Sequence, residues 1–212
     1  PRSTLFPYTT LFRSIDTSTG LATSFNSGAN SAVLDLIISS DNTTLYAGGH
    51  FTSIGGQSRN RLATINTSTG LATSFNPNAS SIVRTLALDS NNTTLYVGGD
   101  FTTIGGQTRN KLASFTTSDG TLTSFNPSLN STVRTLVLSN DNTTLYVGGN
   151  FTTIGGQTRN RIAAVNTSTG LATSFNPNAG STVRTLVLNS DNTTLYVGGS
   201  FATISGQSRR RV

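Results

Sequence analysis

The sequence predicts an all-β fold made of one small sheet repeated along the chain, and three observations lead to this prediction. A unit of 50 residues recurs in constant phase, with FTSIGGQSRN at Phe51, FTTIGGQTRN at Phe101 and Phe151, and FATISGQSRR at Phe201. Only 10% of residues are charged, and the abundant Thr, Ser, Asn and Gly suit strands and turns. No long apolar pattern has the helical period of 3.6 residues. We therefore expect almost no helix.

One unit, beginning at Val83, divides into four predicted strands. VRTLALD at 83–89 and TLYVGGDF at 94–101 are rich in β-branched and aliphatic residues, and the polar residues between them predict a hairpin. A longer loop, TTIGGQTRN, leads to KLASFTT, and the turn SDG leads to TLTSFNP as the fourth strand. Pro127 ends that strand, which we place at the outer edge because proline cannot donate a ladder hydrogen bond.

Four antiparallel strands in each 50-residue unit predict the blades of a β-propeller. The first strand of a unit is the most continuously apolar, so we place it nearest the centre. Gly98 and Gly99 predict a bulge or a close backbone approach. A β-solenoid, with coils of roughly 20–30 residues, and sandwich domains of about 100 residues fit the period less well. Side chains expected to pack between neighbouring blades are Leu86, Leu88, Tyr96 and Phe101.

The motifs LYVGGDF, IGGQTRN and SFN recur together over residues 15–212. In this combination the chain resembles the delta-60 repeat family of bacterial surface and secreted proteins. The paired glycines after an apolar strand are also similar to kelch blades, although the Trp of that blade is missing. The resemblance implies a β-propeller in an extracellular or cell-surface setting, and it supplies no catalytic residues.

Both chain ends depart from the repeat. Residues 1–14, PRSTLFPYTTLFRS, resemble translated sequencing-adapter sequence, so we interpret them as non-native and treat 15–212 as a single array of about four repeats. A degenerate capping repeat is the alternative. RRRV replaces RNRL at the other end, and the sequence contains no Met. We therefore expect a fragment of a larger ring, or a four-bladed ring if its two end pairs meet.

An open arc would expose two apolar blade faces. We therefore expect the isolated chain to self-associate through these faces or to be only marginally stable.

The net charge of +6 would allow an anionic partner. Five of the 14 basic residues lie at the aberrant ends, however, so we do not expect a nucleic-acid surface. The chain has no Cys, which excludes disulfides and thiolate metal sites. It has no apolar run of about 18 residues, so we expect no membrane span. The five terminal basic residues are Arg2, Arg13, Arg209, Arg210 and Arg211.

The position directly after each glycine pair is polar but varies between repeats, as a ligand-contacting position would. An alternative is that any small polar group suits a strand end. The turns of the type DNTT contain one carboxylate each, too few for the six to eight oxygen ligands of calcium, so we expect hairpin turns and no metal. The candidate ligand contacts are His50, Asp100, Asn150 and Ser200.

No catalytic constellation stands out among eight acidic residues and one histidine, so we expect no enzyme activity and no cofactor. The sequence favours a noncatalytic binding or structural scaffold of a bacterial secreted or cell-surface protein, with a protein or carbohydrate ligand. The alternative is an accessory propeller beside a catalytic domain outside this segment. No secretion signal is visible, which we attribute to a truncated N-terminus.

Overall fold

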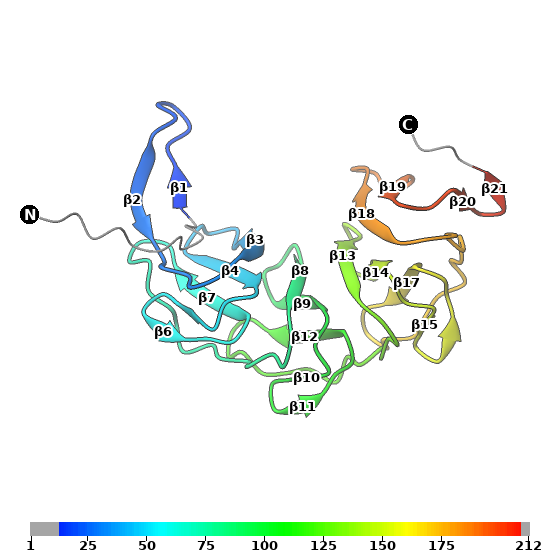
Figure 1. Ribbon diagram of the computed structural model, residues 1–212, viewed down its shortest axis with the longest axis horizontal. Coiled ribbons are helices and arrows are strands. Elements are labelled where there is room, and N and C mark those ends of the chain that lie inside the picture. Colours follow the sequence, from blue (N-terminus) through cyan, green and yellow to red (C-terminus); the bar gives the residue numbers. More distant parts are fainter. Residues whose placement is uncertain (1–12, 209–212) are drawn as a thin grey trace, which may run out of the picture.

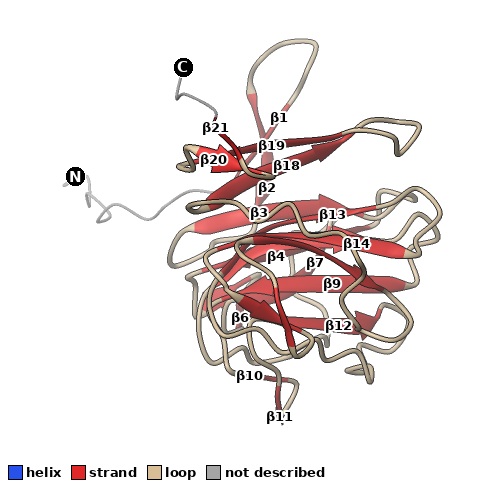
Figure 2. Cartoon of the chain, turned by 90° about the vertical axis from the view of Figure 1, so that its right-hand side faces the viewer, coloured by secondary structure: helices blue, strands red, loops and turns tan. Residues whose placement is uncertain are grey.

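The computed structural model describes residues 13–208, which form an open arc of small β-sheets (Figure 1). This part of the chain consists of strands, turns and loops without helix, as predicted, and contains no helix that could cross a membrane. Seen from the side, the strands run between the two faces of the arc, and loops lie at both faces (Figure 2). Residues 1–12 of the segment interpreted as non-native lie outside the described residues, and its last two residues, Arg13 and Ser14, lie with Ile15 in the first strand.

Three antiparallel sheets of three strands each form the blades within residues 13–208. In every blade the first strand lies at the inner edge of the arc (Figure 1), which confirms the placement predicted from its apolar sequence. The blades consist of β3 (Val33–Ile38), β4 (Thr44–Gly49) and β7 (Leu62–Asn66); β8 (Val83–Leu88), β9 (Thr94–Gly99) and β12 (Leu112–Thr116); and β13 (Val133–Leu138), β14 (Thr144–Gly149) and β17 (Ile162–Asn166).

A two-stranded sheet lies at each end of the arc (Figure 1). β1 (Arg13–Ile15) pairs with β2 (Ala22–Asn26), in the phase of the third and fourth strands of a unit. β18 (Val183–Leu188) pairs with β19 (Leu195–Gly199), in the phase of the first and second strands. The two end pairs lie apart, so the described residues form an arc and not the closed four-bladed ring that the sequence left open.

The long loop of each repeat contains a short hairpin that the sequence did not predict. Its two strands have two residues each and are joined by glycines or serine with positive φ, such as Gly105 at 60° and Gly106 at 74°. These hairpins lie toward the outside of the arc (Figure 1). They are β5 (Ser53–Ile54) with β6 (Gln57–Ser58), β10 (Thr103–Ile104) with β11 (Gln107–Thr108), β15 (Thr153–Ile154) with β16 (Gln157–Thr158), and β20 (Thr203–Ile204) with β21 (Gln207–Ser208).

The prediction of a fourth strand in each complete blade is wrong, because each of these sheets has three regular strands. In the second blade the fourth strand is reduced to one bridge, between Phe115 and Leu122. Arg109 Nη2 donates to the carbonyl of Thr123 at 2.9 Å, so an arginine takes an acceptor that a ladder would use. Pro127 then ends the segment. Arg59 and Arg159 make the same contact in the other blades, to Thr73 and Thr173.

The hydrophobic core lies between successive blades, as predicted. One cluster joins Tyr46 of the first blade to Leu86, Leu95 and Phe101 of the second. Phe101 is fully buried and Leu86 is 5% exposed. Fully burying such a side chain contributes roughly 1.5–3 kcal/mol, and a single small sheet cannot bury both of its faces alone. Stacking therefore supplies the stability of each blade.

The DNTT turns, and the equivalent NNTT turn at 91–94, hold neighbouring blades together as well as closing hairpins. Asn92 has a φ of 56°, the left-handed conformation that asparagine tolerates in tight turns. Its side-chain oxygen accepts a hydrogen bond from the backbone nitrogen of Ser40 in the preceding blade at 3.1 Å. Asn142 and Asn192 do the same for Ser90 and Asn140. Each of these asparagines thus links two blades.

Candidate functional site

The four candidate contact residues occupy one equivalent position, where the second strand of a unit leaves its sheet. A backbone hydrogen bond ties each of them to the residue immediately before the first strand of its own unit. For Asp100 this bond runs from its nitrogen to the carbonyl of Ile82 at 2.8 Å. The structure therefore brings these positions to one face of the arc, at the start of successive inner strands. The equivalent bonds join His50 to Ala32, Asn150 to Thr132 and Ser200 to Thr182.

A β-bulge lies beside this position and is built by the glycine pair, as predicted. Val83 is paired with Gly99 but Thr85 with Gly98, so Arg84 is the extra residue of the inner strand. A Cβ on Gly99 would lie 2.1 Å from the carbonyl oxygen of Ile82, a distance that permits only glycine. Bulges turn a side chain away from the regular alternation of a strand. Here the residue at the bulge is an arginine.

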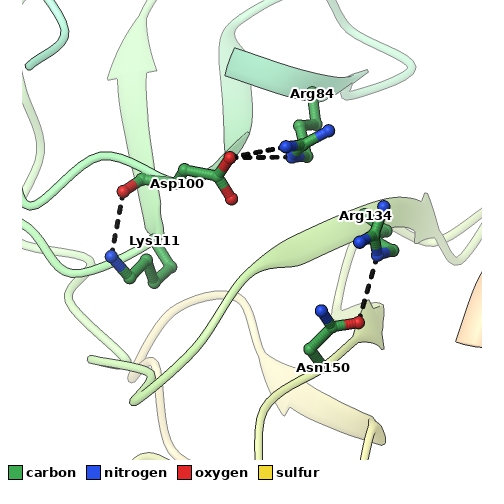
Figure 3. Close-up of polar contacts among 5 residues, drawn as sticks. All are labelled: Arg84, Asp100, Lys111, Arg134 and Asn150. Carbon is green, nitrogen blue, oxygen red and sulfur yellow. Dashed lines mark hydrogen bonds and ion pairs between the residues drawn. The ribbon is translucent and has the colours of Figure 1, made fainter. Parts of the chain in front are cut away.

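The bulged arginine of each later unit donates to the candidate contact residue 16 positions further on, and Figure 3 shows the first two of these pairs. Arg84 binds Asp100 Oδ2 through Nε at 3.0 Å and through Nη2 at 2.7 Å. Arg134 Nε donates to Asn150 Oδ1 at 3.1 Å (Figure 3). In the last unit, Arg184 Nε donates to Ser200 Oγ at 3.2 Å. We call Arg84, Arg134 and Arg184 the arginine row.

The charge along the arginine row is unevenly compensated. The pair of Arg84 with Asp100 is the only salt bridge within residues 13–208, and Lys111 Nζ adds a bond to the Asp100 carbonyl at 2.9 Å. Arg134 meets a neutral amide, and its terminal nitrogens have no hydrogen-bond partner among the described residues. Arg184, which is exposed, meets a neutral hydroxyl. The second half of the row therefore carries uncompensated positive charge.

The pKa values of Asp100 and Arg134 reflect the charges that surround them. Partial burial acts to raise the pKa of Asp100, but the hydrogen bonds from Arg84 and Thr132 and the charges of Arg84 and Lys111 outweigh it and lower this pKa. Burial lowers the pKa of Arg134, and the neighbouring charges of Arg84 and Arg184 lower it further. The charges of Arg84 and Arg184 thus both disfavour the charged form of Arg134. An anion beside Arg134 would oppose that effect.

The first blade does not continue the arginine row. Its residue at the bulged position is Leu34, which is 42% exposed. His50, the candidate contact of this blade, is exposed, and no arginine occupies the bulged position of its unit. The structure brings Asp100, Asn150 and Ser200 into one arrangement with arginines, and His50 stands outside it.

Reasoning from sequence missed the arginine row, although a signal was present. An arginine precedes the variable polar position by 16 residues in each of the last three units. The spacing alone does not reveal that the two side chains meet. In a regular strand, side chains alternate between the two faces of the sheet, and this alternation would fix the direction of the arginine. The bulge changes that direction.

The DNTT turns behave as the hairpin turns that the sequence predicts. The carboxylate of Asp141 accepts hydrogen bonds from the hydroxyl of Ser139 at 2.5 Å and from the backbone nitrogen of Thr143 at 3.1 Å. These bonds lower the pKa of Asp141. In the part of the chain that the structure describes, no three His, Cys, Asp or Glu side chains gather into a possible metal site.

A concave region separate from the arginine row lies between the first two blades. This hollow of about 550 Å³ is lined mainly by Thr, Ser and backbone groups around Tyr46 and Phe75, with Asp119 at its edge. Hydrogen bonds from Thr116 and Thr121 lower the pKa of Asp119 to about 2. The hollow has no cationic side chain in its lining, in contrast to the arginine row.

Comparison with known families agrees with this architecture. The family model of the Rax2 C-terminal beta propeller domain matches residues 61–181, more than half of the chain. The chain belongs to the Rax2 C-terminal β-propeller family. A second model, a β-propeller domain of unknown function (DUF5122), matches residues 40–68 of this Rax2-type propeller. A search of curated proteins gives no significant match.

A solved structure shows the same fold. The crystal structure of the RRP9 WD40 repeats superimposes on this Rax2-type propeller with a TM-score of 0.53 at 14% sequence identity. The match covers 73% of this chain and 41% of the RRP9 chain, so the present chain spans less than half of that structure. At this identity the likeness concerns the β-propeller fold alone, a fold consistent with a binding scaffold.

Proposed function

We propose that this chain is a noncatalytic binding scaffold whose ligand contacts the arginine row. The observation that carries this proposal is the pairing of Arg134 and Arg184 with neutral partners, which leaves their positive charge uncompensated on one face of the arc. β-Propellers commonly present ligand-binding loops at one face of a rigid ring of sheets, and the family match supports that role.

The chemistry of the row favours a ligand with carboxylate groups. A guanidinium group can donate two parallel hydrogen bonds to a carboxylate, and neighbouring arginines can bind successive acidic groups of a polymer. We therefore propose an acidic carbohydrate, of the uronic acid class, as the ligand. An acidic protein segment carries the same groups and is the comparison in the test below.

The setting of this scaffold is proposed from the repeat motifs. LYVGGDF and IGGQTRN support a repeat of the delta-60 type, with kelch-like glycine pairs, in a bacterial secreted or cell-surface protein. The alternative is an accessory propeller of a larger extracellular enzyme. Sequencing the complete reading frame distinguishes the two, because a catalytic domain beside the array would favour the alternative, whereas anchors or further repeats would favour the scaffold.

Removal of the uncompensated arginines should weaken ligand binding. We expect the double variant Arg134→Gln/Arg184→Gln to bind polygalacturonate about fivefold to thirtyfold more weakly, because each lost exposed ion pair costs about 0.5–1 kcal/mol. Binding by the natural chain should also weaken at high salt. Isothermal titration calorimetry with polygalacturonate and with polyglutamate measures both effects and separates carbohydrate from protein ligands.

Two further variants sharpen this test. Asp100→Asn places an amide opposite Arg84, as Asn150 stands opposite Arg134, so binding should strengthen about twofold to fivefold. Ser168→Asp changes the net charge by the same amount as one Arg→Gln substitution, but it lies in an exposed turn at the opposite face and should leave binding unchanged. Equal losses in Ser168→Asp and in the arginine variants would show a net-charge effect and reject the proposed site.

A further inference from the structure

The two ends of the arc expose sheet faces that are buried between the interior blades. At the C-terminal end, Val187 is 59% and Tyr196 is 62% exposed, and we call these two residues with Gly198 the forward face. At the N-terminal end, Leu36 is 39% and Ile38 is 47% exposed, and with Val33 they form the rear face. Exposed apolar patches of this kind mark interaction surfaces.

The equivalent residues of interior blades are covered by a neighbouring blade. Tyr96, which corresponds to Tyr196, is 5% exposed, and Leu86 and Leu136, which correspond to Leu36, are 5% and 7% exposed. The contacts between interior blades therefore show which surface covers each of these faces. A forward face is covered by the rear face of the next blade.

Neighbouring interior blades pack so closely that a glycine is required at their contact. Tyr46 of the first blade lies in one cluster with Leu86 and Leu95 of the second. A Cβ on Gly48 would lie 2.6 Å from Val83 Cγ1, so the next blade packs directly onto this glycine. Gly198, the equivalent at the C-terminal end, has only Thr185 of its own blade within 4 Å of such an atom. The valine that would cover it corresponds to Val33.

Polar groups at the two ends match in the same way. Between interior blades, Asn92 and Asn142 accept hydrogen bonds from the backbone nitrogens of Ser40 and Ser90. The side-chain amide of Asn42, at the rear end, is exposed and has no partner within residues 13–208. The backbone nitrogen of Ser190, at the forward end, likewise has no partner in this range. The backbone nitrogen of Ser190 and the side-chain oxygen of Asn42 are the donor and the acceptor of an equivalent hydrogen bond between two ends.

The two-stranded sheets at the ends of the arc also correspond to the two halves of one blade. β18 and β19 are the first two strands of a blade, and β1 and β2 are in the phase of its last two strands. Alignment with the pairing of β14 and β17 places Ile15 opposite Leu195. In the described residues of one chain these two pairs lie at separate ends of the arc (Figure 1). A second copy can bring them together.

We propose that the forward face of one copy binds the rear face of a second copy and reproduces the contact between interior blades. β1 and β2 of the second copy then complete the blade that β18 and β19 of the first copy begin. This interface is heterologous, because two different surfaces of the chain meet. It is independent of the arginine row and of any ligand.

Sedimentation velocity of the 212-residue chain tests this proposal. The natural chain should sediment at tens of micromolar as a species of two or more copies. Val187→Asp/Tyr196→Asp blocks the forward face and Leu36→Asp/Ile38→Asp blocks the rear face, so each variant alone should be monomeric. An equimolar mixture should give a one-to-one heterodimer, since one intact face of each kind remains. Leu171→Asp, at a residue 61% exposed outside both faces, should associate like the natural chain.

Engineered disulfides provide a second measurement that does not depend on blocking a face. In the interior contact, a Cβ on Gly48 would lie 3.4 Å from the Cβ of Val83, close to the separation in disulfides. The chain has no natural cysteine. Val33→Cys/Gly198→Cys should therefore form covalent oligomers on mild oxidation, whereas either single cysteine should give almost none.

Three results would overturn the proposal. A monomeric natural chain at tens of micromolar would reject the interface. Association of either blocked variant by itself would indicate contact between like faces. Absence of oligomers from the oxidised double-cysteine chain would reject the predicted register. Circular dichroism establishes that each variant retains its strand content before these results are compared.

Discussion

Asp35 shows how one residue can alter the link between two blades. The later units carry Thr85, Thr135 and Thr185 at its position. Asp35 Oδ2 accepts a hydrogen bond from the backbone nitrogen of Leu86 in the next blade at 2.7 Å, and Thr85 Oγ1 accepts the equivalent bond at 3.2 Å. The hydroxyl makes this link without a charge. The carboxylate makes it in a partly buried position.

Burial raises the pKa of Asp35 above its usual value of 3.8, although hydrogen bonds from Leu86, Leu36 and Thr85 act in the opposite direction. The folded chain therefore binds this proton more tightly than the unfolded chain. The resulting stabilisation is fully present below the unfolded pKa and is lost as the pH rises through the folded pKa.

Asp35→Thr should therefore raise the free energy of unfolding at pH 7, and the gain should shrink as the pH falls toward 3. Urea unfolding at several pH values measures this difference. Thr85→Asp should lower stability with a steeper pH dependence, because it removes the hydrogen bond from Thr85 to Asp35 and adds a second carboxylate beside it. A difference between Asp35→Thr and the natural chain that is independent of pH would contradict the assigned cause.

The arginine row shows the limit of prediction at the residue scale. The sequence identified Asp100, Asn150 and Ser200 as equivalent polar positions because they share one phase of the repeat. It did not identify their partners, because the direction of Arg84 and its equivalents depends on a bulge. Gly98 and Gly99 predicted that a bulge could form, but not which side chain it would redirect.

At the element scale, the glycine pair sets how closely blades pack. A Cβ on Gly98 would lie 2.5 Å from Val133 Cγ1 in the next blade and 2.9 Å from Thr85 Cγ2. A Cβ on Gly198 would approach only Thr185. The same substitution at these two sites therefore separates packing between blades from packing within one.

Gly98→Ala should lower the free energy of unfolding by about 1–3 kcal/mol, because the added methyl group overpacks the contact between blades. Gly198→Ala should cost clearly less, since a single threonine methyl group can shift. Urea unfolding at protein concentrations below those of association provides the comparison. Equal costs would indicate that the gap between blades can widen freely.

Elements defined by local pattern were predicted well, and those defined by distant side chains were not. The hairpin of the first two strands follows from two runs of β-branched and aliphatic residues with a polar turn between them. The fourth strand is reduced to one bridge in each blade, and an arginine of the preceding loop donates to one of its carbonyl groups in every case, namely Arg59, Arg109 and Arg159. In the N-terminal pair, by contrast, β2 is a full strand of five residues.

At the scale of the whole molecule, the arc separates two kinds of surface. The inner strands begin at the face with the arginine row, and this face carries the proposed ligand site. The sheet faces at the two ends of the arc carry the proposed contact with a second copy. The period of 50 residues predicted the stacking that produces both surfaces. It could not predict the charge of the row, which arises where Asn150 and Ser200 replace Asp100.

NMR mapping of an acidic ligand most directly tests the central claim that the face with the bulges is the binding face. Polygalacturonate fragments added to the nitrogen-15-labelled chain should shift the signals of Arg134, Asn150, Arg184 and Ser200, with smaller shifts at Arg84 and Asp100. Signals of the turns at the opposite face, such as those of Asn142 and Asn192, should stay in place. Shifts confined to those turns, or to the hollow around Tyr46 and Phe75, would contradict the account.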